Sequence, residues 1–146
     1  MIRDRFVRTR SAVVELAIIQ AQLSEMGDDW KPDTARGTGV AKPTESRAIY
    51  ELDVLAGRIE QLKAREQELL EFIGTTLAII EGVRNGLGND YAEILDQRYI
   101  DGFRWSEVTV DGETVNERTG RYKVSIAFDW IDSVGLTGVL GGDYEL

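Results

Sequence analysis

The chain has 146 residues, of which 42% are hydrophobic and 29% are charged, and 26 Asp and Glu against 17 Lys and Arg give a formal net charge of −9. This composition excludes wholesale disorder, and the length fits one ordinary domain or a small globular unit with an extended helical appendage. Cysteine and histidine are both absent, which excludes disulfides, metal sites built on Cys or His, and Ser-His-Asp or Cys-His catalysis.

The N-terminal residues MIRDRFVRTRSAVV carry four arginines and no long apolar run, and Glu15 interrupts the sequence that follows. This pattern is neither a signal peptide nor a membrane span, so we expect a cytoplasmic protein without a membrane partner. From residue 6 to 26 the spacing predicts a helix with an apolar face, which Gly27 ends. The members of that face are Phe6, Val13, Leu16, Ile19 and Leu23. Residues 28–42 are rich in Gly, Asp and Thr and predict a long, partly disordered loop.

A second and much longer helix is predicted from Arg47 to Asn85, with Thr44 as its cap after Pro43. Its positions step by three and four residues, as in a coiled coil: Leu52, Leu55, Ile59, Leu62, Glu66, Leu69, Ile73, Thr76, Ile80 and Val83. Such a helix is on the order of 60 Å long and must cover its apolar stripe with another helix. The partner is the first helix, folded back antiparallel, or the same helix of another subunit. Because the first helix is shorter, we expect residues 1–88 to form a helical hairpin that also makes a homodimer.

Glu66 and Thr76 are polar residues within the apolar stripe. We interpret them as local weak points of the packing, with Glu66 extending its charge outward. The alternative is that they fix the register or the number of partners, as buried polar residues of a coiled coil can.

The sequence of residues 89–132 predicts three short helical segments, each with apolar residues on one face. The first is residues 91–100, with Asn89 or Asp90 as its cap and Asp101-Gly102 as its end. Trp105 and Val108 offer one turn, and residues 117–131 form the last helix. Residues 133–146 predict a flexible tail. The expected fold is therefore all-α, with a long antiparallel helical hairpin followed by a small C-terminal helix-turn-helix bundle.

The segment EILDQRYIDGFRWSEV resembles the start of region 4 of sigma factors and of the related RinA and ArpU group of phage late transcription regulators. Asn116-Glu117-Arg118-Thr119 falls where these proteins begin their recognition helix, and PTESRAI, at residues 43–49, also matches the phage members. The resemblance covers about residues 43–131. It implies a helix-turn-helix whose core contains Tyr99 and Trp105, and a DNA-reading last helix.

Two features depart from this resemblance. Thr109, Glu113 and Thr114 stand where the family has alanine, leucine and glycine, and EVTVDGETVN alternates around Asp-Gly, which is a β-hairpin signal. We therefore keep a short β-hairpin at 107–116 as the alternative to the second helix of the bundle.

The charge is also unusual for a DNA-binding module. Residues 90–146 hold 5 Lys and Arg against 12 Asp and Glu, so duplex binding requires the few cations to gather on one face. The predicted DNA-binding residues of the last helix are Arg118, Thr119, Arg121, Tyr122 and Lys123; the alternative is an ordinary solvated face with ion pairs. A second basic cluster, at Arg3, Arg5, Arg8 and Arg10, is interpreted as an exposed helix face, with a second phosphate contact as the alternative.

The carboxylates, lysines and tyrosines match no known catalytic arrangement, so we expect no enzyme activity, no cofactor and no metal. The sequence and the resemblance together predict a phage or prophage regulator that binds double-stranded DNA sequence-specifically and acts as a homodimer. The alternative is a structural or adaptor protein that acts by protein contacts. It would bind RNA polymerase or serve as a small terminase-like packaging subunit.

Overall fold

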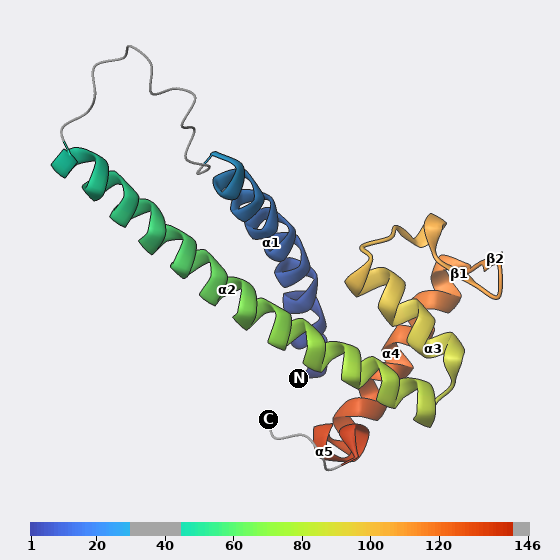
Figure 1. The fold of residues 1–146 in the computed structure, drawn as a ribbon. Coiled ribbons are helices and arrows are strands. Elements are labelled where there is room, and N and C mark those ends of the chain that lie inside the picture. Colours follow the sequence, from blue (N-terminus) through green and yellow to red (C-terminus); the bar gives the residue numbers. More distant parts are fainter. Residues whose placement is uncertain (30–44, 142–146) are drawn as a thin grey trace. The chain divides into compact units, whose positions relative to one another are not determined.

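The fold of the chain is mostly helical in a computed structural model, which describes the backbone of residues 1–29 and 45–141 and the side chains of residues 1–26 and 50–141 (Figure 1). These residues contain five α-helices, a π-helical turn, a 3-10 turn and one small two-stranded sheet. The chain divides into two compact units: unit 1 is Met1–Val14 with Glu71–Leu146, and unit 2 is Glu15–Leu70. The boundaries at residues 88 and 132 stay predictions. Within the described residues, no helix combines the length and apolarity that a membrane crossing needs.

Two long helices account for most of the N-terminal residues. Helix α1, Ile2–Asp29, begins four residues before its predicted start. The prediction that Gly27 ends this helix is wrong, because the helix continues to Asp29. Helix α2, Glu45–Gly86, agrees with its predicted extent. The predicted cap Thr44 and residues 30–42 of the predicted loop lie outside the described residues.

In unit 1, the start of α1 contacts the C-terminal part of α2 through a buried polar cluster. The side-chain oxygens of Thr9 and Thr76 lie 2.8 Å apart, and neither side chain is exposed to solvent. Arg5 Nε donates a hydrogen bond to the same Thr76 oxygen at 3.1 Å, and Arg5 Nη2 donates to the Phe72 carbonyl at 3.1 Å. Because Thr76 has hydrogen-bond partners on the facing helix, these contacts favour the alternative interpretation, in which Thr76 helps to fix the alignment of α1 and α2.

Unit 2 has a sparse core. Arg65 donates hydrogen bonds from Nε and Nη2 to the Glu15 carboxylate, which joins α1 to α2 within this unit. Among its described side chains only Ile19 and Leu69 are buried, and Leu55, Ile59, Leu62 and Glu66 are half-buried. A pair of helices has one contact line, so much of the apolar stripe stays in contact with solvent.

The chain then turns into α3, Asn89–Leu95, which continues into the π-helical turn η2, Asp96–Ile100. The N-cap of α3 is Gly88, and no side chain caps it, so the prediction of Asn89 or Asp90 as cap is wrong. Instead, Arg84 at the end of α2 donates to Asn89 and, at 3.0 Å, to Glu93. The turn after Asp101 occurs at Gly102, whose φ is 73°.

Residues 105–114 contain a 3-10 turn and a β-hairpin, with no α-helix between them. The 3-10 turn η3 is Trp105–Glu107, and strand β1, Thr109–Val110, pairs antiparallel with β2, Glu113–Thr114. Asp111 and Gly112 both have positive φ, 54° and 82°, which is the conformation of a type I′ hairpin turn. The second helix that the resemblance implied over 107–116 is therefore absent, and the β-hairpin kept as the alternative is present, with strands at Thr109–Val110 and Glu113–Thr114. The buried Gln97 amide exchanges two hydrogen bonds with the Thr109 backbone and holds the hairpin against η2.

Helix α4, Glu117–Val134, extends three residues past its predicted end and is followed by α5, Leu136–Leu140. The sequence predicts a flexible tail from residue 133, but Val139 of α5 is buried. A Cβ on Gly82 of α2 would lie 2.5 Å from the Val139 side chain. This glycine therefore lets α5 approach α2 closely.

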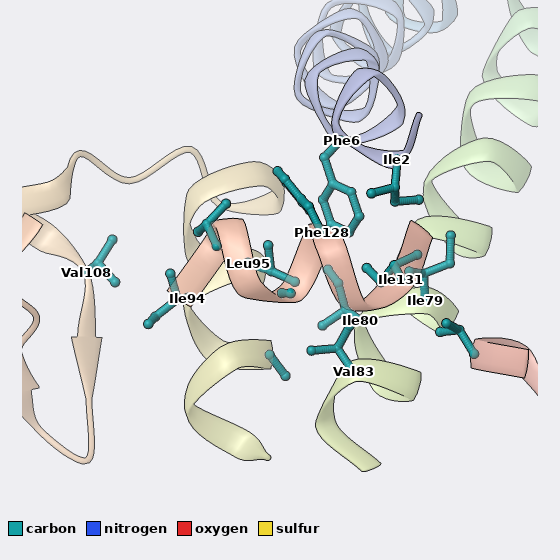
Figure 2. Close-up of a cluster of buried hydrophobic side chains, with 14 residues drawn as sticks. Ile2, Phe6, Ile79, Ile80, Val83, Ile94, Leu95, Val108, Phe128 and Ile131 are labelled. Atoms are coloured by element: carbon teal, nitrogen blue, oxygen red, sulfur yellow. The ribbon is translucent and has the colours of Figure 1, made fainter. Parts of the chain in front are cut away.

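The core of unit 1 forms around the apolar face of α4 (Figure 2). Phe6 of α1 and Phe128 of α4 have ring centroids 5.1 Å apart, and Tyr99 of η2 lies 5.4 Å from Phe6 and 5.9 Å from Phe128. The same cluster contains Ile79, Ile80 and Val83 of α2, Ile94 and Leu95 of α3, and Ile131 of α4. Residues of α1, α2, α3 and α5 thus cover the buried face of α4, and the other face is left in solvent.

Candidate nucleic-acid interface

Helix α4 has one buried and one exposed face over its first three turns. Gly120, Val124, Ala127 and Phe128 are buried. Arg118, Thr119, Arg121 and Tyr122 are exposed, and Tyr122 keeps 66% of its surface in solvent. Residues three and four apart share a helix face, so Arg118, Arg121 and Tyr122 lie on one side of α4. Four of the five residues predicted to bind DNA are therefore open to solvent.

The N-terminus of α4 is closed by a side-chain cap. Asn116 Oδ1 accepts a hydrogen bond from the backbone N–H of Arg118 at 2.9 Å. The remaining N–H groups of the first turn and the aligned peptide dipoles give this end of the helix a partial positive charge. The helix terminus and the arginines beside it thus favour the same kind of ligand, an anion.

Trp105 packs against the start of α4 at Gly120. A Cβ on Gly120 would lie 2.3 Å from Trp105 Cζ3, so the absence of a side chain at residue 120 makes room for the indole ring. The indole N–H is buried and has no acceptor in the described part of the chain. A buried donor without an acceptor lowers the stability of the fold by about 1–3 kcal/mol. The packing of the indole ring against α4 must offset this cost.

Arg118 and Arg121 are the two predicted site residues that are both exposed and positively charged. Arg121 donates from Nε and Nη2 to Glu117 Oε1, at 3.0 and 2.8 Å, one turn earlier in the helix. Both side chains are mostly exposed, and an exposed pair of this kind contributes only about 0.3–0.5 kcal/mol. Because this pair is weak, an anion that binds arginine more tightly, such as a phosphate, can take the place of Glu117 as the partner of Arg121. Arg118 has an exposed side chain, and no ion pair reaches it within the described residues.

Lys123 does not join this exposed group. Its Nζ lies 3.3 Å from Asp90 Oδ2 and 5.4 Å from the centre of the Tyr91 ring, both in α3. Its side chain is 27% exposed against 66% for Arg121. The structure thus uses Lys123 to connect α4 with α3, and brings together only the other four predicted residues.

The N-terminal arginines make contacts within unit 1. Arg5 and Arg8 lie over the Phe72 ring, at 4.3 and 5.1 Å from its centroid, and Arg3 lies 5.1 Å from the Phe128 centroid. Burial, and secondarily the charge of Arg8, lower the pKa of Arg5. Arg10 Nη1 donates to the Ile100 carbonyl at 3.0 Å. These contacts attach α1 to its neighbours.

Sequence reasoning did not select Arg98 as a site residue. Its guanidinium carbon lies 4.6 Å from the Trp105 ring centroid, and that of Arg121 lies 5.8 Å from it. Arg98 Nη1 also donates to the Phe103 carbonyl at 2.6 Å. The only sequence signal was the closeness of Arg98 to the tryptophan, and the contact with Arg121 depends on the fold.

Carboxylates also lie on α3 and η2 and at the residue that follows η2. Burial and the neighbouring carboxylates of Asp101 and Glu93 raise the pKa of Asp96. The described residues contain no group of three or more side chains suited to hold a metal ion.

Three comparisons with known proteins gave no match, whether with protein-family models, with curated proteins or with solved structures.

Proposed function

We propose that this protein binds double-stranded DNA sequence-specifically through helix α4, as a phage or prophage transcription regulator. Its C-terminal part would then work as a sigma region 4-like helix-turn-helix in which a β-hairpin takes the place of the second helix. Arg118, Thr119, Arg121 and Tyr122 would contact the duplex. Lys123 would support α4 from behind through Asp90.

One observation carries the proposal: α4 is held by its buried face while two arginines, a threonine and a tyrosine of its first two turns stay in solvent. Recognition helices of DNA-binding proteins offer their N-terminal residues to base edges in the same way. Arginine donates hydrogen bonds to guanine edges and to phosphates, and threonine can form a hydrogen bond with a base or an apolar contact with the thymine methyl group. The resemblance to sigma region 4 described in the sequence analysis supports DNA as the ligand of this exposed face.

Selection from a library of randomised duplexes tests the proposal. The wild-type protein should enrich a defined sequence, and the variant Arg118→Ala/Tyr122→Ala should lose that enrichment while it keeps its fold. The matched control is Arg58→Ala/Gln61→Ala, which removes an exposed cation and an exposed polar side chain from α2. Unchanged enrichment in the α4 variant, or no enriched sequence with the wild type, would overturn the proposal.

A second candidate function, an adaptor that binds another protein, is favoured by the charge of the hairpin. Asp111 and Glu113 at its turn are exposed, and duplex DNA would repel them. A basic surface, such as one on RNA polymerase, would attract them. Asp111→Asn/Glu113→Gln should weaken capture of a basic partner and leave DNA binding intact or stronger, so the pair of measurements separates the two functions.

We also infer that the protein forms a homodimer through unit 2. Tyr50, Leu52 and Val54 of α2 are exposed, at 68, 48 and 54%, and a second copy would supply two further helices to cover them. Sedimentation equilibrium should give a dimer. A ring of many subunits would instead favour the small terminase-like alternative, and a monomer would contradict both.

A further inference from the structure

Trp105 brings together two arginines that lie far apart in the sequence. The guanidinium carbons of Arg98 and Arg121 lie 4.6 and 5.8 Å from the centroid of its ring. The ring itself is fixed against Gly120, where no side chain would fit. Stacking of a guanidinium on an indole restricts its motion without using its N–H groups. The ring therefore acts as a common support for both cations.

Both guanidinium groups keep N–H donors for a ligand. A guanidinium has five N–H donors in one plane. Arg98 uses Nη1 to hold the Phe103 carbonyl, and Arg121 uses Nε and Nη2 on a single oxygen of Glu117. The remaining donors suit an acceptor with several oxygens, such as a phosphate, which arginine binds in a bidentate manner.

The elements around Trp105 carry more cations than the rest of the C-terminal part. Arg10 belongs to this corner as well, because its guanidinium reaches the Ile100 carbonyl and lies against Gly102. The arginines on these elements are Arg10, Arg98, Arg104, Arg118 and Arg121, and the carboxylates are Asp96, Asp101, Glu107 and Glu117. Cations and carboxylates are thus nearly balanced here, although residues 90–146 are acidic in total.

We propose that Arg98 and Arg121, supported by Trp105, bind the phosphate backbone of the DNA beside the bases that α4 reads. This inference rests on the proposed function and adds a residue, Arg98, from outside the recognition helix. A backbone contact of this kind fixes the position of the protein on the duplex and carries no sequence information. The contact therefore adds the same binding free energy on every duplex, and this contribution falls as the salt concentration rises.

The test is the salt dependence of the dissociation constant, measured by fluorescence anisotropy on the selected duplex and on an unrelated duplex. Each lost phosphate contact lowers the slope of log K against log salt by about 0.9. Arg98→Gln should lower the slope by that amount and weaken binding by the same factor on both duplexes. Arg98→Lys keeps the charge and should restore most of the slope. Lys63→Gln, which removes a charge from α2, should leave the slope unchanged.

The outcomes separate this inference from the proposed function. If the wild type binds neither duplex, the proposed function fails. If the wild type binds and Arg98→Gln keeps the wild-type slope, only the phosphate contact is overturned. A loss restricted to the selected duplex would mean that Arg98 reads bases, which also overturns it. If Arg98→Gln does not fold, Arg121→Gln, whose side chain is 66% exposed, carries the same test.

Discussion

The side-chain oxygens of Thr9 and Thr76 lie 2.8 Å apart between two helices, and both residues are completely buried. Each hydroxyl also bonds to the backbone of its own helix, Thr9 to the Arg5 carbonyl at 2.8 Å and Thr76 to the Phe72 carbonyl at 3.3 Å. The pair therefore connects the backbone hydrogen bonds of α1 to those of α2 through the two hydroxyl groups. It aligns α1 with α2 inside unit 1, where a purely apolar stripe would tolerate sliding by a turn.

Replacement of Thr76 by valine should lower the free energy of unfolding by about 1–3 kcal/mol, because Arg5 Nε and the Thr9 hydroxyl lose a buried partner. Urea unfolding measures this change. Thr75→Val is the matched control, since the Thr75 hydroxyl donates a hydrogen bond to the Glu71 carbonyl of its own helix. The double variant Thr9→Val/Thr76→Val should be more stable than the sum of the two single changes predicts. Strictly additive losses would mean that the two hydroxyls do not interact.

The contact between Gly120 and Trp105 gives a second prediction. Gly120→Ala would place its methyl group 2.3 Å from the indole, so we expect a loss of about 1–3 kcal/mol in spite of the better helix propensity of alanine. Gly74→Ala is the control: Gly74 also lies within a helix, and an added Cβ meets nothing within 4 Å. That variant should be neutral or more stable by up to about 1 kcal/mol. Equal thermal stability of the two variants would contradict the packing described for Trp105.

The raised pKa of Asp96 predicts how stability changes with pH. Because the folded state raises this pKa, it binds the proton more tightly than the unfolded state does. The stabilisation is present at low pH and is lost as pH rises through the folded pKa. At neutral pH the charged Asp96 therefore destabilises the fold.

Asp96→Asn should accordingly raise the free energy of unfolding at neutral pH, and the gain over wild type should shrink as the pH is lowered. Denaturant unfolding over a range of pH measures both. Asp129→Asn, which replaces an exposed aspartate of α4, is the control for the change of side chain. A gain at Asp96 that does not depend on pH would show that its charge is not the cause.

The pair between Arg121 and Glu117 predicts a variant with tighter DNA binding. In Glu117→Gln the arginine loses its competing carboxylate, and the duplex meets one negative charge fewer. We expect the affinity to rise several-fold at low salt, since an exposed ion pair of about 0.3–0.5 kcal/mol and a repulsion are both removed. Glu60→Gln of α2 serves as the control for net charge. Weaker binding by Glu117→Gln would mean that Glu117 itself contacts the DNA or orders Arg121 for it.

Much of the fold could be predicted from local sequence. The spacing of apolar residues predicted α2 closely, because helix periodicity is a local property. Asp111-Gly112 predicted the hairpin for the same reason, since both residues tolerate the positive φ of a type I′ turn. Where the resemblance implied a helix over 107–116, the local signal was the better guide.

Features that depend on contacts between distant residues could not be predicted. Thr76 looks like a defect until Thr9, 67 residues earlier, is seen to face it. Lys123 looked like an outward cation, but Asp90 is 33 residues away in sequence and adjacent in space. The stacking of Arg98 on Trp105 likewise required the position of η2 beside η3. The predicted DNA-binding role of α4 stays a prediction.

The most direct test of DNA binding by α4 is the dissociation constant for duplex DNA as a function of salt. Two charge-matched double variants are compared with the wild type: Arg118→Gln/Arg121→Gln on α4, and Arg58→Gln/Lys63→Gln on α2. The account predicts salt-sensitive binding by the wild type and by the α2 variant, and a slope lower by about 2 in the α4 variant. Equal slopes for the two variants, or a wild type that does not bind duplex DNA even at low salt, would contradict it.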